Sequence, residues 1–150
     1  MLTLQELSDR AEIQDLLVVE ASSMDRRDWT RWQSVFTPDA FIDYSENDGA
    51  KGDPLEVRAW LEVVLGRFHS YQHLSSNSEM ELDGDRARVR SMQYIAVKME
   101  TSREVRVVFS GIWFRDDLIR TPEGWRIARR HEELAWRHNF PEDFAPPTAG

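Results

Sequence analysis

The amino-acid sequence predicts an α+β domain in which N-terminal helices pack on a strongly curved, mainly antiparallel sheet. Apolar residues recur at helical spacing in the first half of the chain and alternate, as in strands, after Phe68. This order is typical of the class, because the long sheet must bury one face against the helices. The length of 150 residues fits one domain over residues 1–150. Such a sheet encloses a cone, whose concave side is suited to a small-molecule pocket.

The first half of the chain predicts three helices, over residues 3–25, 28–36 and 54–68. Thr3 is the N-cap of the first helix, and Glu6 completes a capping box. Pro54 suits the first turn of the third helix, because its backbone angle is already helical. Between the second and third helices we expect a short strand over 39–45 and a loop over 46–53, which is rich in Gly, Asn and Asp.

The second half predicts four strands, over residues 71–82, 86–99, 103–114 and 125–135. The pair Asp83-Gly84 between the first two strands is a strong signal for a two-residue hairpin turn. Residues 141–150 contain three of the six prolines and are expected to form an irregular tail. Phe140 and Phe144 are the side chains able to fold this tail back onto the body.

The composition excludes several classes of partner. The chain has 27 acidic and 19 basic residues, and its net charge of -8 opposes binding to nucleic acid or to anionic lipid. It contains no cysteine, which excludes thiolate catalysis and cysteine-bound metals. Neither a signal peptide nor an apolar run of about 20 residues is recognisable. We therefore expect a cytoplasmic protein that binds neither membranes nor nucleic acid.

No metal or other cofactor is expected. His131-Glu132-Glu133 looks like the start of a zinc-protease motif, but the next histidine, His138, does not have the i, i+4 spacing that two ligands on one helical face require. The chain also lacks a glycine-rich phosphate loop and a nucleophile elbow. The remaining chemistry is acid–base catalysis by carboxylates, histidines and tyrosines.

The first helix draws attention to Asp25. Helical spacing predicts a buried stripe made of Leu7, Ala11, Val18, Ser22 and Asp25. A negative charge at the C-terminal end of a helix is opposed by the macrodipole, so a buried Asp25 needs a partner. An ion pair with Arg26, Arg27 or a distant arginine is one possibility. A histidine is the alternative, because a buried carboxylate fixes the tautomer of an imidazole and raises its basicity.

Four histidines are candidates for this partner. His69 and His138 lie at positions typical of solvated or capping side chains, and His131 lies in a run of charges typical of a solvated strand face. His73 differs, because its strand face is polar without being a charge run. The residues predicted to share that face are Tyr71, Ser75 and Asn77. Such a face is either a site or an exposed surface.

Six features, in this order along the chain, carry a family resemblance: a helix ending in Asp25, the pair Asp28-Trp29, Phe36-Thr37-x-Asp39-Ala40, Tyr44, Gly52 and Gln72-His73. They resemble the SnoaL-like branch of the nuclear-transport-factor-2-like superfamily. The resemblance covers nearly the whole chain, and it implies a cone-shaped α+β barrel, the cystatin-like fold.

Within that branch the chain is most similar to two enzymes that catalyse eliminations. The residues that resemble scytalone dehydratase are Met24 to Trp29, Ile42-Asp43-Tyr44 and Gln72-His73. Those that resemble γ-hexachlorocyclohexane dehydrochlorinase are Asp25, His73, Trp113 and Arg129. In both relatives the aspartate orients the histidine, which removes a proton from carbon. The resemblance therefore implies that His73 is a general base and that Asp25 orients it.

The resemblance also implies five further site residues. Tyr44 falls where the dehydratase has a tyrosine that binds the water-bridged carbonyl oxygen, so Tyr44 is expected to polarise a carbonyl or to protonate the departing hydroxyl. Met24 replaces a second tyrosine of the dehydratase, and Ser110 falls about where the dehydratase has an asparagine. Trp113 is expected to be an apolar wall, and Arg129 an anchor for an anionic or phenolic oxygen.

Together these features predict a cofactor-independent lyase, a dehydratase that expels a β-leaving group from a small cyclic substrate. A ketone isomerase or a polyketide cyclase needs the same base and oxyanion donor, so both remain open. A non-catalytic small subunit, as in ring-hydroxylating dioxygenases, also remains open. Relatives assemble through their sheets, and the chain has more tryptophan than one small core usually holds, so a homo-oligomer, dimer or trimer, is expected.

Overall fold

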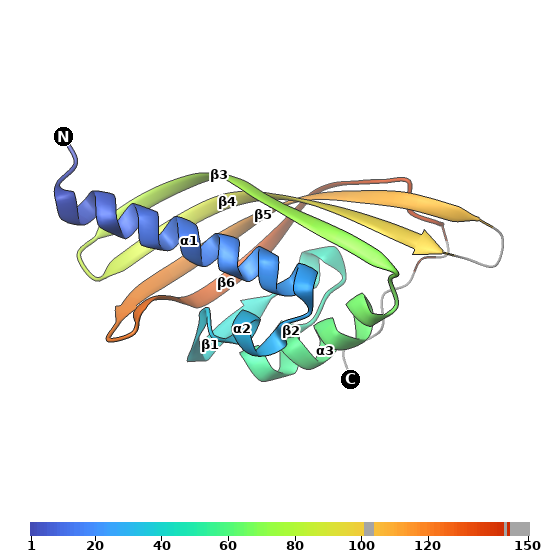
Figure 1. Cartoon of the computed structure of the whole chain (residues 1–150), viewed down its shortest axis with the longest axis horizontal. Coiled ribbons are helices and arrows are strands. Elements are labelled where there is room, and N and C mark those ends of the chain that lie inside the picture. The colour runs from blue at the N-terminus through green and yellow to red at the C-terminus, as the bar shows by residue number, and fades with distance from the viewer. Residues whose placement is uncertain (101–103, 143, 145–150) are drawn as a thin grey trace.

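The computed structural model describes residues 1–100, 104–142 and 144, and in it helices pack on one curved sheet (Figure 1). The helices are α1 (Leu4–Arg26), α2 (Trp29–Gln33) and α3 (Pro54–Gly66), with a short 3-10 turn, η1 (Ser45–Asn47). The strands are β1 (Phe36–Asp43), β2 (Lys51–Gly52), β3 (Ser70–Asp83), β4 (Arg86–Glu100), β5 (Val105–Thr121) and β6 (Gly124–His138). The predicted α+β fold with helices on a curved sheet is confirmed.

The six strands form one sheet in the order β2-β1-β6-β5-β4-β3. Among the described strands only the pairing of β1 with β6 is parallel, so the sheet is mainly antiparallel, as expected. Figure 1 shows α1 lying across the sheet, and α3 leading directly into β3. Among the residues that the structure describes, no helix combines the length and the apolar character that crossing a membrane requires.

Some predicted boundaries were wrong. The second helix ends at Gln33, and Phe36 already belongs to β1, which includes Pro38 at a point where the register with β6 shifts. Proline is tolerated there because an irregular strand position does not need its N–H in the ladder. The predicted strand beginning at residue 103 starts outside the described residues. Of the predicted tail over 141–150, only residues 141, 142 and 144 are described.

The buried face of α1 also differs from the predicted stripe. Its buried residues are Asp9, Ile13, Leu17, Glu20, Ala21, Ser23 and Met24. Leu7 and Val18, which were predicted to be buried, are about half exposed. The helix buries two carboxylates, Asp9 and Glu20, which apolar spacing does not detect, and its buried face lies roughly 140° around the helix from the predicted stripe. Asp25 therefore lies at the edge of the buried face.

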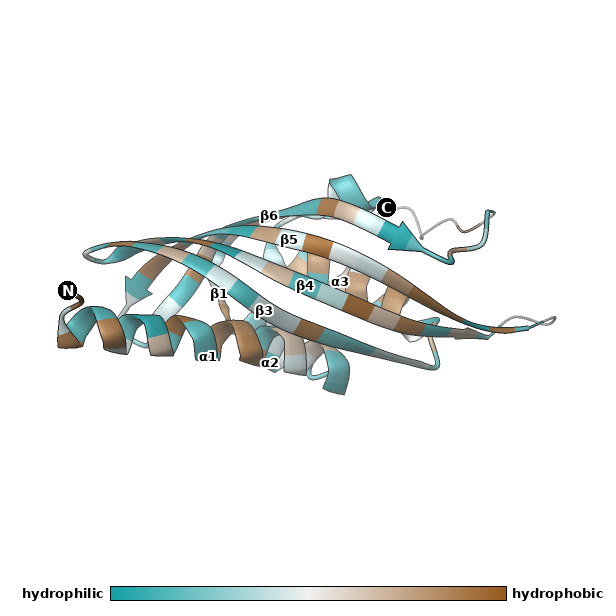
Figure 2. Cartoon of the chain, turned by 90° about the horizontal axis from the view of Figure 1, so that it is seen from above, coloured by the Kyte–Doolittle hydropathy of each residue, from teal (hydrophilic) through white to brown (hydrophobic). Residues whose placement is uncertain are grey.

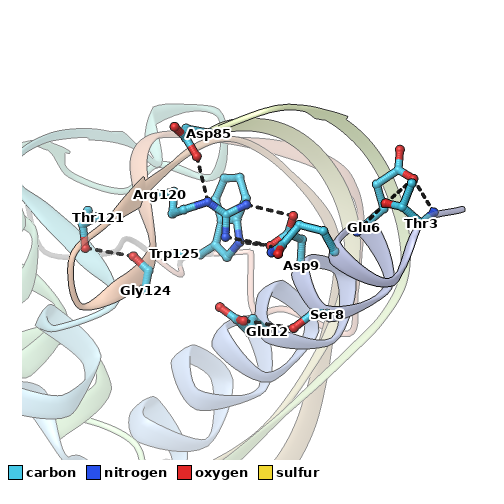
Figure 3. Close-up of polar contacts among 11 residues, drawn as sticks. Thr3, Glu6, Ser8, Asp9, Glu12, Asp85, Arg120, Thr121, Gly124 and Trp125 are labelled. Atoms are coloured by element: carbon cyan, nitrogen blue, oxygen red, sulfur yellow. Dashed lines mark hydrogen bonds and ion pairs between the residues drawn. The ribbon is translucent and has the colours of Figure 1, made fainter.

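Asp9 anchors the start of α1 to the hairpin between β5 and β6 (Figure 3). Its carboxylate accepts hydrogen bonds from Arg120 Nη1 at 2.7 Å, from Arg120 Nη2 at 2.8 Å and from Trp125 Nε1 at 3.2 Å. Arg120 also donates from Nε to Asp85, in the turn after β3, at 2.8 Å. The hydrogen bonds from Arg120 lower the pKa of Asp9 to about 2. Arg120 of β5 thus connects the start of α1 with the turn after β3.

Irregularities in the strands decide which side chains face the helices. β6 pairs Ile127 with Leu118 but Arg129 with Asp117, so Ala128 is an extra residue in the ladder. Because strand side chains alternate between faces, this bulge changes the inward set, and both Ile127 and Arg130 point to the interior. A second shift in β3, between Ser76 and Glu79, leaves Asn77 with a φ of 45° and exposes it, contrary to the predicted face.

Candidate active site

A cavity of about 120 Å³ opens between α3, the end of α1 and the concave face of the sheet. Most of its wall is apolar and comes from α3 and β4, including Leu61, Val64, Leu65, Ile95 and Val97. Polar side chains enter it from β3, β4, β5, β6 and the segment after β1, namely His73, Gln93, Ser110, Glu132 and Tyr44. An apolar chamber with a few convergent polar groups is the usual form of a small-molecule site.

His73 and Asp25 are in direct contact at the wall of this cavity. His73 Nδ1 lies 2.6 Å from Asp25 Oδ1, and the main-chain N–H of His73 donates to the same carboxylate at 3.0 Å. The His73 side chain is 3% exposed and that of Asp25 is 24% exposed. Because the carboxylate accepts from Nδ1, Nε2 is the ring nitrogen left for a ligand in the cavity. Asp25 itself lines a shallow depression on the outside, so only His73 reaches the interior.

Local structure explains how these two residues meet. β3 is an edge strand, so some of its main-chain N–H groups lack a neighbouring strand, and Asp25 accepts from one of them. The helix ends two residues later at Arg27, whose φ of 56° closes α1. Arg27 donates from Nη2 to the Phe68 carbonyl at 2.9 Å, and the Tyr71 hydroxyl donates to the Met24 carbonyl at 2.9 Å. The C-terminal end of α1 is thereby fixed against the start of β3.

Tyr44 is buried and lines the cavity from the segment after β1. Its ring centroid lies 6.0 Å from that of Phe114. Its hydroxyl has no hydrogen-bond partner among the described residues. Burial raises the pKa of Tyr44, with Arg130 acting in the opposite direction, so the phenol stays neutral. The backbone at Gly49 passes very close to Tyr44. A Cβ at position 49 would lie 2.7 Å from Tyr44 Cβ, so only glycine fits there.

A buried ion cluster lies behind Tyr44. Arg130 is fully buried and donates to both oxygens of Asp116, from Nε and Nη2, each at 2.8 Å. Arg130 Nη1 lies 2.8 Å from Glu20 Oε1, and Glu20 also accepts from Trp32 Nε1 at 3.2 Å. The charge of Arg130 is therefore matched by two carboxylates within the protein. This cluster joins α1 to β5 and β6.

Glu132 is a site residue that sequence reasoning missed. It is 5% exposed and lines the cavity. Burial raises its pKa to about 8, opposed by a hydrogen bond from Asn47 and by the charge of Arg130. The carboxyl is therefore mainly protonated at neutral pH and is able to donate a proton. The run 129–133 contains charges on both strand faces, so without the bulge at Ala128 no sequence signal identifies Glu132 as buried.

Two predicted substrate contacts were wrong. Trp113 lies on the outer face of β5, with the guanidinium of Arg90 3.9 Å from its ring centroid, because Ile112 and Phe114 take the inward positions. Arg129 is exposed on the outer face of β6, 5.6 Å from the ring of Phe41, because the bulge turns Arg130 inward instead. Neither residue lines the cavity, whereas Met24 and Ser110 do.

Gln93 was also missed, although a signal for it exists. Ala87, Val89 and Ser91 alternate inward along β4, and the next inward position is Gln93. Its side chain is 1% exposed, and neither its amide nitrogen nor its amide oxygen has a partner among the described residues. No group of three or more His, Asp or Glu side chains in the described part of the chain is arranged to hold a metal ion.

The sequence and the fold both match known proteins. A SnoaL-like domain matches residues 5–131. The uncharacterized protein Rv2910c of Mycobacterium tuberculosis is 43% identical over 132 residues, which cover 88% of this chain and 89% of that protein. A putative scytalone dehydratase from Novosphingobium aromaticivorans has a TM-score of 0.79 at 18% identity, covering 94% of this chain and 93% of that one. The hexachlorocyclohexane dehydrochlorinase LinA-type3 from Novosphingobium barchaimii has a TM-score of 0.78 at 20% identity, covering 96% and 99%. These two structures share the fold.

Proposed function

This chain belongs to the SnoaL-like family, and we propose that it is a cofactor-independent lyase that removes water from a small cyclic substrate. The observation that carries the proposal is the 2.6 Å contact between His73 Nδ1 and Asp25 at the wall of a mainly apolar cavity. The fold is shared with a putative scytalone dehydratase and with hexachlorocyclohexane dehydrochlorinases, which supports an elimination. The reaction proposed here is a dehydration of a β-hydroxy carbonyl compound.

His73 is the base in this scheme. Its Nε2 removes the proton from the carbon next to the carbonyl, and Asp25 stabilises the imidazolium that forms. A positioned general base of this kind contributes a factor of about 10² to 10⁴ in rate. Asp25 does not touch the substrate; it holds the ring in one tautomer and one orientation. It is therefore a positioning residue.

Tyr44 stabilises the negative charge that develops on the carbonyl oxygen. Its neutral hydroxyl is buried and has no hydrogen-bond partner among the described residues, so it is available as a donor. A donor that is already oriented in a dry cavity stabilises an enolate more than water does, because it needs no reorganisation. The negative charge of the intermediate thus lies on the carbonyl oxygen of the substrate, which accepts a hydrogen bond from Tyr44.

Glu132 supplies the proton for the departing hydroxyl. Its carboxyl is protonated near neutral pH and lines the same cavity. The proton from carbon goes to His73, the carbon–oxygen bond breaks, and the proton of Glu132 completes the water molecule. The imidazolium then releases one proton and Glu132 takes one up, so the enzyme returns to its first state. The same neutral carboxyl would serve a ketone isomerase as a hydrogen-bond donor to the enolate oxygen, so the product formed distinguishes the two reactions.

The proposal is tested with 3-hydroxycyclohexanone and related cyclic β-hydroxy ketones, whose dehydration gives a conjugated enone that absorbs in the ultraviolet. Wild-type protein is expected to form the enone, and His73→Ala is expected to abolish turnover while its circular dichroism spectrum stays unchanged. His69→Ala is the matched control, because His69 is an exposed histidine outside the cavity. Turnover that survives His73→Ala, or no enone from any of these compounds, would contradict the proposal.

We also propose that the protein is a homo-oligomer. Apolar side chains stand exposed on the ends of the strands that extend past the helices, where Figure 2 shows hydrophobic segments of β4 and β5. They include Tyr94, Val105, Val107, Phe109 and Trp136. A contiguous exposed apolar patch is typical of an interface, and cyclic symmetry would give a dimer or a trimer. Sedimentation equilibrium of wild type and of Phe109→Asp distinguishes an oligomer from a monomer.

A further inference from the structure

Gln93 has a buried amide that the protein itself does not use. It lies in the middle of β4, where its pairing partners are Ser75 on β3 and Ile112 on β5. Ile112 is apolar, and Ser75 makes no hydrogen bond to the amide. Both polar atoms of the Gln93 side chain lack a partner among the described residues, although the side chain lines the cavity. A buried polar group without a partner destabilises a fold, so its presence calls for a functional explanation.

The chemistry of an amide defines what would satisfy it. Gln93 offers two N–H donors and one carbonyl acceptor side by side. A ligand that satisfies both ends must carry an acceptor and a donor next to each other, such as a carbonyl oxygen and a hydroxyl on the same edge of a ring. Tyr44 adds a further unpartnered donor to the same cavity, and a carbonyl oxygen has two lone pairs that can accept from both.

The charges around the cavity argue for an uncharged ligand. Arg130 is already paired with Asp116 and Glu20. Arg137, which lines the mouth, lies 2.9 Å from Asp48 through Nη1 and donates from Nε to Asn47 at 2.9 Å. A carboxylate or phosphate on the ligand would therefore lose its water without gaining a free cation, which is unfavourable.

The size of the cavity limits the ligand to about one ring. A closed dry cavity of about 150 Å³ accommodates benzene, whereas the cavity here measures about 120 Å³ and is partly open to the surface, so it admits one ring whose substituents can extend toward the opening. We propose that Gln93 is the specificity-determining residue of this site, and that it selects an uncharged single-ring β-hydroxy ketone by binding the carbonyl and the hydroxyl together. This inference rests on the proposed function for the identity of the reacting groups, and it adds the substrate class.

Binding without turnover tests the inference directly. In the His73→Ala background, dissociation constants are measured by NMR titration for 3-hydroxycyclohexanone, for cyclohexanone and for cyclohexanol. We expect 3-hydroxycyclohexanone to bind about tenfold more tightly than either single-function ring, because only it satisfies both ends of the amide. Adding Gln93→Met, which keeps the shape and removes the polar atoms, is expected to bring the ratio close to one. Gln93→Leu serves as a second variant if the first does not fold.

A stability measurement separates recognition from a structural role. Without ligand, Gln93→Met is expected to raise the melting temperature, because it removes an unpaired buried amide. Gln72→Met is the matched control, since it makes the same change at an exposed position of the neighbouring strand. An unchanged binding ratio, or a lower melting temperature of Gln93→Met, overturns the inference. Failure of the lyase proposal shows separately, as absence of enone from wild-type protein.

Discussion

Asp25 holds His73 through two different groups, the ring Nδ1 at 2.6 Å and the main-chain N–H at 3.0 Å. The second bond fixes the backbone from which the ring projects, so the carboxylate controls both the position and the tautomer of the imidazole. The surroundings of the two charges differ as well. An imidazolium formed at His73 is buried, and it lies against a carboxylate that is partly screened by solvent. This arrangement makes Asp25 the sharpest test of the proposed chemistry.

Replacing Asp25 by Asn is expected to lower kcat by a factor of about 10² or more, because the imidazole loses its charge partner and its tautomer control. KM is expected to change little, since Asp25 does not line the cavity. Steady-state kinetics of enone formation measures both values. Asp15→Asn, an exposed aspartate of α1, is the control. Equal activity of Asp25→Asn and wild type would contradict a role for the pair.

Tyr44→Phe is expected to lower kcat by about tenfold, because the enolate loses one of its hydrogen-bond donors. The variant is expected to keep or slightly raise the melting temperature, since the hydroxyl it removes has no partner among the described residues. Kinetics and differential scanning calorimetry on the same preparation measure both effects. Unchanged kcat would remove Tyr44 from the mechanism without affecting His73.

Glu132→Gln is expected to change how stability depends on pH. The pKa of Glu132 is about 8 in the folded chain, above its ordinary value of 4.5. Between these values the native state holds a proton that the unfolded chain releases, so this group's contribution to stability is lost as pH rises from 4.5 toward 8. In Glu132→Gln the urea midpoint should therefore fall less over this range than in wild type. Parallel curves would show that Glu132 is ionised in the native state.

The same substitution tests the proton donor. Wild-type kcat/KM is expected to fall as pH rises through about 8, where Glu132 loses its proton. Glu132→Gln cannot supply a proton, so kcat should fall by about 10² and this alkaline limb should disappear. Glu133→Gln, on the outer face of the same strand, is the matched control. A retained limb near pH 8 would assign it to another group.

Asp9→Asn is expected to destabilise the fold by about 2 kcal/mol at neutral pH, because charge-assisted hydrogen bonds from Arg120 are lost. The pKa of Asp9 is lowered to about 2 from its ordinary value of 3.8, so this stabilisation is present above pH 3.8 and is lost as pH falls toward 2. Urea unfolding at pH 7 and pH 2.5 measures the difference between variant and wild type. A difference that does not shrink in acid would exclude the ion pair as its source.

Apolar spacing and turn residues were sufficient to predict the helices, the hairpin at Gly84 and the mainly antiparallel sheet. The contact between Asp25 and His73 was predicted by the family resemblance. Helical spacing did not predict it, because the stripe that includes Asp25 is not the buried face of α1, and Asp25 lies at the edge of that face. What the sequence cannot show is which charges are buried. Asp9 meets Arg120 across 111 residues, and no local pattern reveals such a partner.

The error at Arg129 has its physical origin in strand register. A side chain changes face when one residue is added to a strand, so the single bulge at Ala128 exchanges Arg129 for Arg130 and brings Glu132 to the cavity. Alternation within β4 has no such interruption before Gln93, so this inward position was predictable although it was missed. Along β5 the alternation is uninterrupted, so the error at Trp113 came from the family resemblance and not from a bulge.

The hydrogen bond from the main chain of His73 to Asp25 also bears on aggregation. An edge strand with free N–H groups is a template onto which a foreign strand can grow. At His73 that position is taken by a carboxylate, which satisfies the donor and presents negative charge to any approaching chain. One side chain therefore serves the solubility of the sheet as well as the orientation of the imidazole, and losing it exposes the protein to strand addition at the place where the chemistry is organised.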